Sequence, residues 1–136
     1  MKRFLFIFIF LIPIAAFAEP IIVFEGQPTV KILNEGEASG TFEKLAPPKA
    51  ANLKCAISKI GDEYFWTSRN YTPLFLIDSG GFFTFIAMSG SGYIRVIKGD
   101  FKQAASQISE TEKDFDYVEH LVLGLRSVTY YGTRAD

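Results

Sequence analysis

Apolar and polar side chains alternate along the middle of the chain. Between residues 53 and 98 the apolar positions recur at every second residue, and turns such as Gly61-Asp62 and Ser79-Gly80-Gly81 separate the runs. This period is that of a β-strand, and glycine supplies the positive φ angles that tight hairpin turns require. The strongest hairpin signal is the turn at residues 89–92. The pattern predicts an antiparallel meander over residues 53–98.

The segment before the meander, residues 19–52, is more loosely organised. Short apolar runs at 21–24, 30–33 and 41–45 are strand candidates, and polar or glycine-containing stretches separate them. Pro47-Pro48 ends the last run, because proline offers no N–H to a strand ladder. This part of the chain therefore predicts a few short strands joined by loops.

The period of the pattern changes after residue 100. Apolar residues over 101–108 fall on one side of a short helix that Asp100 can cap, and Ser109 with Glu112 forms a capping box. A second helix is predicted over about 110–123, because apolar residues recur there at helical spacings. These residues are Phe115, Val118, Leu121, Val122 and Leu125.

A strand from Tyr117 to Tyr131 is the alternative for the same residues. It would place the charged Glu119 on the same face as Leu121, so the helix is favoured, with a final strand over 125–131. The predicted fold is therefore α+β, an antiparallel sheet of about five to seven strands with one or two helices packed on a face. An all-β barrel or sandwich is the alternative fold.

The first eighteen residues have the three regions of a bacterial signal peptide. Lys2 and Arg3 precede an almost unbroken apolar run, and Ala16 and Ala18 satisfy the small-residue rule for signal peptidase. A helical run of about 14 residues spans about 21 Å, short of the roughly 30 Å core that a membrane anchor must cross. We expect cleavage after Ala18, export to the periplasm or the medium, and one globular domain over 19–136 without a membrane span.

Composition narrows the classes of function. Loss of Lys2 and Arg3 with the signal peptide leaves 12 basic against 15 acidic side chains. A weakly acidic domain is a poor candidate for nucleic-acid binding, which depends on clustered Lys and Arg. One Cys and one His exclude a cysteine-cage zinc site, an iron–sulfur cluster and an intramolecular disulfide, and we expect no cofactor. Cys55, between Leu53 and Ile57 at strand spacing, is predicted to be buried and unreactive.

His120 is the candidate for acid–base catalysis at neutral pH. On the predicted helix it shares a stripe with Glu112 and Asp116, which could hold a divalent metal, although acids on an outer helix face also serve solubility. A serine triad or a dyad with Cys55 can be drawn, but no nucleophile-elbow motif supports either. A non-enzymatic protein is therefore favoured, and a small hydrolase or lyase centred on His120 stays an alternative.

Aromatic residues cluster within the meander and indicate a binding face. Tyr93 and Arg95 share one face of a strand, and Arg69 ends the strand that carries Trp66. Exposed Tyr, Trp and Arg side chains are typical of protein interfaces and of platforms on which sugars stack. The favoured interpretation is nevertheless that these aromatics form a two-sided core. The candidate binding residues, with an envelope protein or a glycan as partner, are Trp66, Arg69, Ser89, Ser91, Tyr93, Arg95 and Lys98.

The stretch Ser89-Gly90-Ser91-Gly92-Tyr93, followed by Lys98-Gly99-Asp100, resembles the exported bacterial inhibitors of C-type lysozyme. The resemblance implies a small β-barrel in which Ser89 and Lys98 contact the lysozyme cleft. The chain departs from that family because it has no second Cys for the disulfide usual there, and a C-terminal helix does not suit a closed barrel. We therefore expect a non-enzymatic binding or accessory protein of the cell envelope, with lysozyme inhibition through the 89–92 turn as an alternative.

Overall fold

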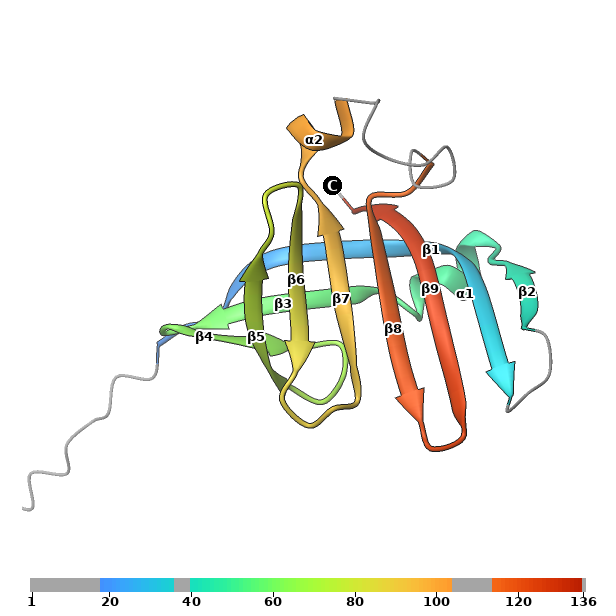
Figure 1. Cartoon of the computed structure of the whole chain (residues 1–136), viewed down its shortest axis with the longest axis horizontal. Helices are drawn as coiled ribbons and strands as arrows, with labels where there is room; N and C mark the ends of the chain where they lie inside the picture. The colour runs from blue at the N-terminus through green and yellow to red at the C-terminus, as the bar shows by residue number, and fades with distance from the viewer. Residues whose placement is uncertain (1–17, 36–39, 104–113, 136) are drawn as a thin grey trace, which may run out of the picture.

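The computed structural model describes residues 18–35, 40–103 and 114–135. These residues form nine strands and two short helices (Figure 1). The strands are β1 (Ile21–Glu35), β2 (Thr41–Lys44), β3 (Cys55–Ile60), β4 (Glu63–Trp66), β5 (Thr72–Asp78), β6 (Phe82–Ala87), β7 (Gly92–Ile97), β8 (Tyr117–Leu123) and β9 (Arg126–Arg134), and the helices are α1 (Pro47–Ala51) and α2 (Gly99–Gln103).

The long strand β1 closes the sheet into an antiparallel barrel. Its first half pairs with β3 and its second half with β9, so eight of the strands described form a closed ring, and β2 pairs beside them on β1. The register of β1 shifts between Ile22 and Phe24 and again between Pro28 and Val30. Such bulges bend a strand, which is how one strand can serve both sides of a barrel.

Side chains fill the interior of the barrel. Inward-facing residues from β1 and from β3 to β8 form one buried cluster, which includes Phe24, Cys55, Ile57, Trp66, Leu74, Phe85, Ile94 and Tyr117. A second cluster packs Leu45 and Ala50, which flank and lie in α1, against Val128 and Tyr130 of β9. Close-packed apolar side chains are the main source of stability in such a domain. Neither helix in the described part of the chain is long and apolar enough to cross a membrane.

The predicted meander over 53–98 is confirmed as five consecutive antiparallel strands, β3 to β7. The hairpin at 89–92 joins β6 to β7, and the final strand predicted at 125–131 overlaps β9 from Arg126 onward. The strand candidates at 21–24 and 30–33 are parts of the single strand β1, which runs through Gly26 and Pro28. Cys55 is fully buried, as the strand spacing predicted.

The α+β prediction is wrong, and the structure has the alternative fold, an all-β barrel. The helix predicted over 110–123 is contradicted by β8, which pairs with β7 and β9. The helix predicted over 101–108 overlaps α2 at residues 101–103, and residues 104–108 and the capping pair Ser109 and Glu112 lie outside the described residues. The charge of Glu119 on the same face as Leu121 disfavours a strand at the level of sequence, yet Glu119 is 0% exposed in β8.

Candidate functional site

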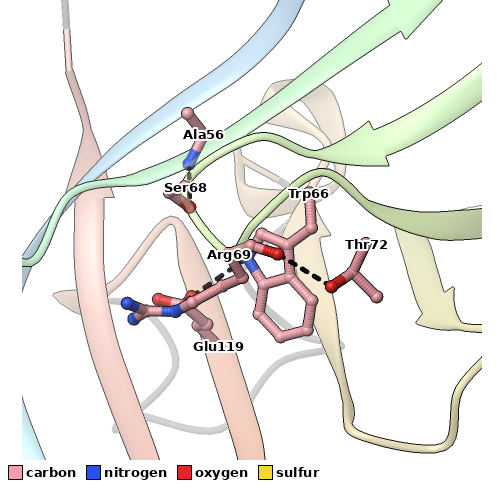
Figure 2. A network of polar contacts seen from close by, with 6 residues as sticks. All are labelled: Ala56, Trp66, Ser68, Arg69, Thr72 and Glu119. Atoms are coloured by element: carbon pink, nitrogen blue, oxygen red, sulfur yellow. Dashed lines mark hydrogen bonds and ion pairs between the residues drawn. The ribbon is translucent and has the colours of Figure 1, made fainter.

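Glu119 lies at the centre of a polar cluster that crosses the barrel (Figure 2). The indole N–H of Trp66 donates to Glu119 Oε1 at 3.1 Å, and Nε–H of Arg69 donates to the same oxygen at 3.0 Å. Trp66 belongs to β4 and Glu119 to β8, with three strands between them in the sheet. Glu119 and Trp66 are both 0% exposed. The barrel therefore holds a buried carboxylate, and the residues of the opposite wall donate hydrogen bonds to only one of its two oxygens.

The electrostatics of this cluster are dominated by burial. Burial raises the pKa of Glu119 to about 7, although the guanidinium of Arg69 and the bond from Trp66 act in the opposite direction. Three buried atoms have no hydrogen-bond partner among the described residues: Arg69 Nη2, Tyr117 Oη and Glu119 Oε2. Buried polar groups left without partners cost stability, so a cluster of this kind points to a role beyond holding the fold together.

The loop between β4 and β5, residues 67–71, carries Arg69 and has a strained backbone. Asn70 and Tyr71 have φ angles of 52° and 55°, in the left-handed region that residues with a Cβ rarely adopt. The Arg69 N–H donates to the carbonyl oxygen of Trp66 at 3.0 Å, and the Thr72 hydroxyl donates to that of Arg69 at 2.7 Å. The side chain of Tyr71 is left 57% exposed. Strained residues of this type are concentrated at functional sites.

Three turns meet at the end of the barrel that carries this loop, on the lower side of Figure 1. They are the β4–β5 loop, the β6–β7 turn at residues 88–91 and the β8–β9 turn at Gly124-Leu125. The Met88 N–H donates to the carbonyl oxygen of Pro73 at 3.0 Å, and the Val122 N–H to that of Ser91 at 2.9 Å, so the β6–β7 turn is tied to the adjoining ends of β5 and β8. We call this surface the loop end.

Large apolar side chains project from all three turns of the loop end. Tyr71 is 57% exposed, Met88 64%, Leu123 57% and Leu125 93%. Single exposed apolar residues are common, but several gathered on adjacent turns are typical of a surface that binds a partner. The loop end is therefore the candidate binding surface of the protein.

The turn at residues 88–91 places two hydroxyls among these apolar residues. Ser89 Oγ and Ser91 Oγ are 2.8 Å apart, and Gly90 has a φ of 76°. Gly92 follows, where a Cβ would lie 2.0 Å from the carbonyl oxygen of His120, so only glycine allows β7 and β8 to approach this closely. The position of Ser89 and Ser91 is thus set by tight packing beneath the turn.

The structure brings only some of the predicted binding residues together. Ser89 and Ser91 lie at the loop end, and Arg69 lies there with its side chain directed at Glu119. Trp66 is in the core, so it is removed from any exposed face. Tyr93 and Arg95 lie on the outer face of β7, with Tyr93 37% exposed and the guanidinium of Arg95 4.7 Å from the ring centre of Phe82.

Lys98, the last of the predicted binding residues, lies at the other end of β7. Five strand residues, Tyr93 to Ile97, separate it from the 89–92 turn, and Gly92 and Lys98 are about 20 Å apart along an extended chain. Its ammonium group forms an ion pair with Asp78 at 2.6 Å. A single flat contact centred on the 89–92 turn therefore does not include Lys98.

His120 lies on the outer face of β8, stacked on Tyr93 with ring centres 5.3 Å apart. Its Nδ1 is 2.9 Å from Thr129 Oγ1. On a strand, four residues span about 13 Å, so Asp116 and His120 are far apart, and Glu112 lies outside the described residues. Cys55 faces the interior, and the barrel wall separates it from His120. In the described segments no group of three or more metal-ligating side chains exists.

Sequence reasoning missed Glu119, Tyr71, Met88, Leu123 and Leu125 as candidate site residues. A signal was present for the last two, because Leu123-Gly124-Leu125 places leucine on both sides of a turn glycine. For Glu119 the signal was an acid at an inward position of an otherwise apolar alternation, between Tyr117 and Leu121. No local pattern marked Tyr71 or Met88 as exposed.

Comparisons with known proteins do not place the chain in a family. No family model, no curated protein and no solved structure matches it. A functional proposal therefore depends on the geometry of the residues just described.

Proposed function

We propose that the protein is an exported, non-enzymatic binding protein of the bacterial envelope that contacts a protein partner through the loop end. The observation that carries this proposal is the group of exposed apolar side chains on three adjacent turns, Tyr71, Met88, Leu123 and Leu125. The signal-peptide pattern of residues 1–18 supports export. Packed side chains occupy the interior of the barrel, which favours a surface over a lumen as the place of binding.

The chemistry of the loop end favours a protein over a glycan. Sugars stack on flat aromatic faces, whereas three of the four projecting side chains are the aliphatic Met88, Leu123 and Leu125. Aliphatic side chains on turns fit an apolar depression or cleft in a partner. Backbone hydrogen bonds tie the β6–β7 turn to the adjoining ends of β5 and β8, so little conformational entropy is lost when this turn docks.

Inhibition of a C-type lysozyme is the second candidate function. The closed antiparallel barrel is the architecture that the resemblance at residues 89–93 implies, and Ser89 and Gly90 of the 89–92 turn are exposed at the loop end. The position of Lys98 at the far end of β7 argues that inhibition would come from the turns without it.

A lysis assay with a C-type lysozyme and bacterial cell walls tests the second candidate. We expect the wild-type protein to slow lysis, Leu125→Asp to lose most of this inhibition, and Lys98→Ala to keep it. Ile21→Asp is the matched control, because Ile21 is 65% exposed and lies in β1, away from the three turns. Inhibition that survives Leu125→Asp but is lost in Lys98→Ala would place the contact elsewhere.

Site-specific photo-crosslinking in intact cells tests the broader proposal. A photoreactive residue at Leu125 should give one discrete crosslinked protein, and the same residue at Ile21 should give none. The product should disappear when Met88 is also changed to Asp. The proposal fails if the crosslink depends on position 21 and not on position 125, or if neither position yields a product.

A further inference from the structure

The buried cluster and the loop end are connected through one residue. The backbone of Arg69 is part of the β4–β5 loop, and its side chain reaches inward to Glu119 at 3.0 Å (Figure 2). Its carbonyl oxygen accepts bonds from the N–H and the hydroxyl of Thr72, at 3.1 and 2.7 Å. Tyr71 lies between these two anchored residues. A group in the interior is thus linked by a short chain of bonds to an exposed aromatic side chain.

The conformation of this loop needs an anchor. Asn70 and Tyr71 are consecutive residues in the left-handed region, at φ angles of 52° and 55°. Each would relax to a right-handed or extended conformation if the loop were released, because its Cβ is crowded in the left-handed region. Ser68 ties the start of the loop to Ala56 of β3, whose N–H donates to Ser68 Oγ at 2.9 Å. Beyond Ser68, the side chain of Arg69 holds the loop inward, through its ion pair with Glu119 and through its guanidinium, which lies 5.7 Å from the ring centre of Tyr130.

We propose that Glu119 is the positioning residue of the loop end: its carboxylate holds Arg69 and so keeps residues 67–71 in the conformation that presents Tyr71, and uptake of a proton by this carboxylate releases the loop. The consequence for partner binding rests on the proposed function. The consequence for the loop itself does not, because the loop conformation can be measured without a partner.

The groups that face Glu119 come from every element around it. They are Arg69 of the β4–β5 loop, Cys55 of β3, Tyr117 of β8 and Tyr130 of β9, together with the uncharged indole of Trp66. Burial raises the pKa of Cys55, of Tyr117 and of Tyr130, so these three are neutral near pH 7. Beyond Tyr130, Glu43 and Lys49 pair with each other at the surface. Arg69 is therefore the one cation among the described residues that offsets the cost of burying the Glu119 carboxylate.

Protonation of Glu119 weakens its interaction with Arg69. The ion pair becomes a bond between a charged donor and a neutral acid, which is weaker. The Arg69 side chain is 26% exposed, and its Nη2 has no hydrogen-bond partner among the described residues, so only the contact with the Tyr130 ring would retain the guanidinium once the ion pair weakens. Since burial raises the pKa of Glu119 to about 7, release is expected just below neutral pH.

Trp66 supplies a direct readout, because it is the one tryptophan of the chain and its indole donates to Glu119. We expect the fluorescence of the wild-type protein to titrate between pH 5 and 9 with a midpoint near 7. Glu119→Gln should abolish this titration, whereas Glu63→Gln, an exposed acid on the same strand as Trp66, should leave it unchanged. Carbon-13 NMR of the Glu119 carboxyl in the wild-type protein gives the same midpoint even if Glu119→Gln does not fold.

Amide exchange at residues 68–72 tests the release of the loop. We expect exchange there to be about tenfold faster at pH 5.5 than at pH 8, after correction for intrinsic rates, with residues 82–87 of β6 unchanged. Arg69→Gln should exchange fast at both pH values. Exchange in the wild-type loop that is independent of pH, or a fluorescence titration that persists in Glu119→Gln, would overturn the proposal.

Partner binding separates this inference from the proposed function. If the loop titrates as expected but the loop end contacts no protein, the positioning role stands and the proposed function fails. If the crosslink or the lysozyme inhibition depends on Leu125 and is equal at pH 5.5 and pH 8, the proposed function stands and the positioning role fails. Both proposals are supported if the wild-type protein loses partner binding at pH 5.5 and the Glu119→Gln variant fails to bind the partner at every pH.

Discussion

The two ends of the barrel are made from turns of the same strands but differ in the kind of side chain that they expose to solvent. At the end opposite the loop end, which we call the charged end, Lys98 pairs with Asp78 at 2.6 Å and Lys102 pairs with Asp116. The Lys98 ammonium also lies 4.4 Å from the ring centre of Phe83. Charged side chains therefore cover the aromatic core there. At the loop end the arginine turns inward instead, and apolar side chains face the solvent.

The difference shows which end of the barrel has features that fold stability alone explains. The pKa of Asp78 is lowered by its bond from Lys98, and burial of Asp116 is outweighed by its bonds from Lys102 and the Arg134 N–H, so its pKa is lowered too. These are the ordinary properties of stabilising surface pairs. Glu119 has the opposite shift, and the residues near it are strained or exposed. The charged end serves the fold, whereas the loop end has features that stability alone does not explain.

The largest effect is expected when the cation of the loop end, Arg69, is removed. Arg69→Met leaves the Glu119 carboxylate buried without its cation, and it should cost about 3–5 kcal/mol of unfolding free energy at pH 8. At pH 5 the cost should be much smaller, because the carboxyl is then neutral. Urea unfolding at both pH values measures the difference. A cost that is the same at both would show that the carboxylate charge is not what Arg69 compensates.

The pH dependence of stability should also separate the ends. Glu119 has a pKa of about 7 in the folded protein against 4.5 for the ordinary group, so its protonated form is favoured by folding. The stabilisation is complete below pH 4.5 and is lost as the pH rises through 7, a change of about 2–3 kcal/mol. The lowered pKa values of Asp78 and Asp116 act in the other sense, and their stabilisation is lost as the pH falls through those values.

Thermal unfolding between pH 4.5 and pH 9 measures this dependence. Glu119→Gln should flatten the decline on the alkaline side and leave the acid side unchanged. A wild-type protein that becomes more stable from pH 5 to pH 8 would contradict the expected sign.

One substitution in a turn of each end should change the unfolding free energy by a smaller amount and with opposite signs. Asn70→Gly at the loop end should raise the unfolding free energy by about 1 kcal/mol, because glycine relieves the left-handed strain. Gly80→Ala at the charged end should lower it by about 1 kcal/mol, since Gly80 has a φ of 76° with no atom near a new Cβ. Denaturant melts of the two variants at pH 7 compare them directly. Equal signs would show that the loop-end backbone is not under strain.

The smallest effects are expected at exposed side chains of both ends. Lys98→Met removes a surface ion pair and should cost no more than about 1 kcal/mol. Leu125→Asp should change the unfolding free energy by less than about 0.5 kcal/mol, because Leu125 is 93% exposed. The same Leu125 variant should lose partner binding, and the Lys98 variant should not. A large loss of stability in Leu125→Asp would mean that Leu125 is structural.

Much of the barrel could be predicted because its strands and turns are local. The alternation over 53–98 and the glycine turns depend on residues that are neighbours in sequence, and the structure has five strands there. The same alternation is present in Tyr117–Leu123, but the charge of Glu119 hid it. Its two partners, Trp66 and Arg69, are 53 and 50 positions away in the chain, so no local pattern could show that a buried acid would be satisfied.

By itself the sequence determined the strand period, the positions of the hairpin turns and the burial of Cys55, and export from the N-terminal pattern stays a prediction. These follow from backbone preferences and from the side-chain pattern over a few residues. Only the tertiary structure decided that β1 closes a barrel, that Trp66 is core while Tyr71 and Leu125 are exposed, and that Glu119 meets Arg69. The physical reason is that closure and the pairing of a buried charge depend on contacts between strands far apart in the chain.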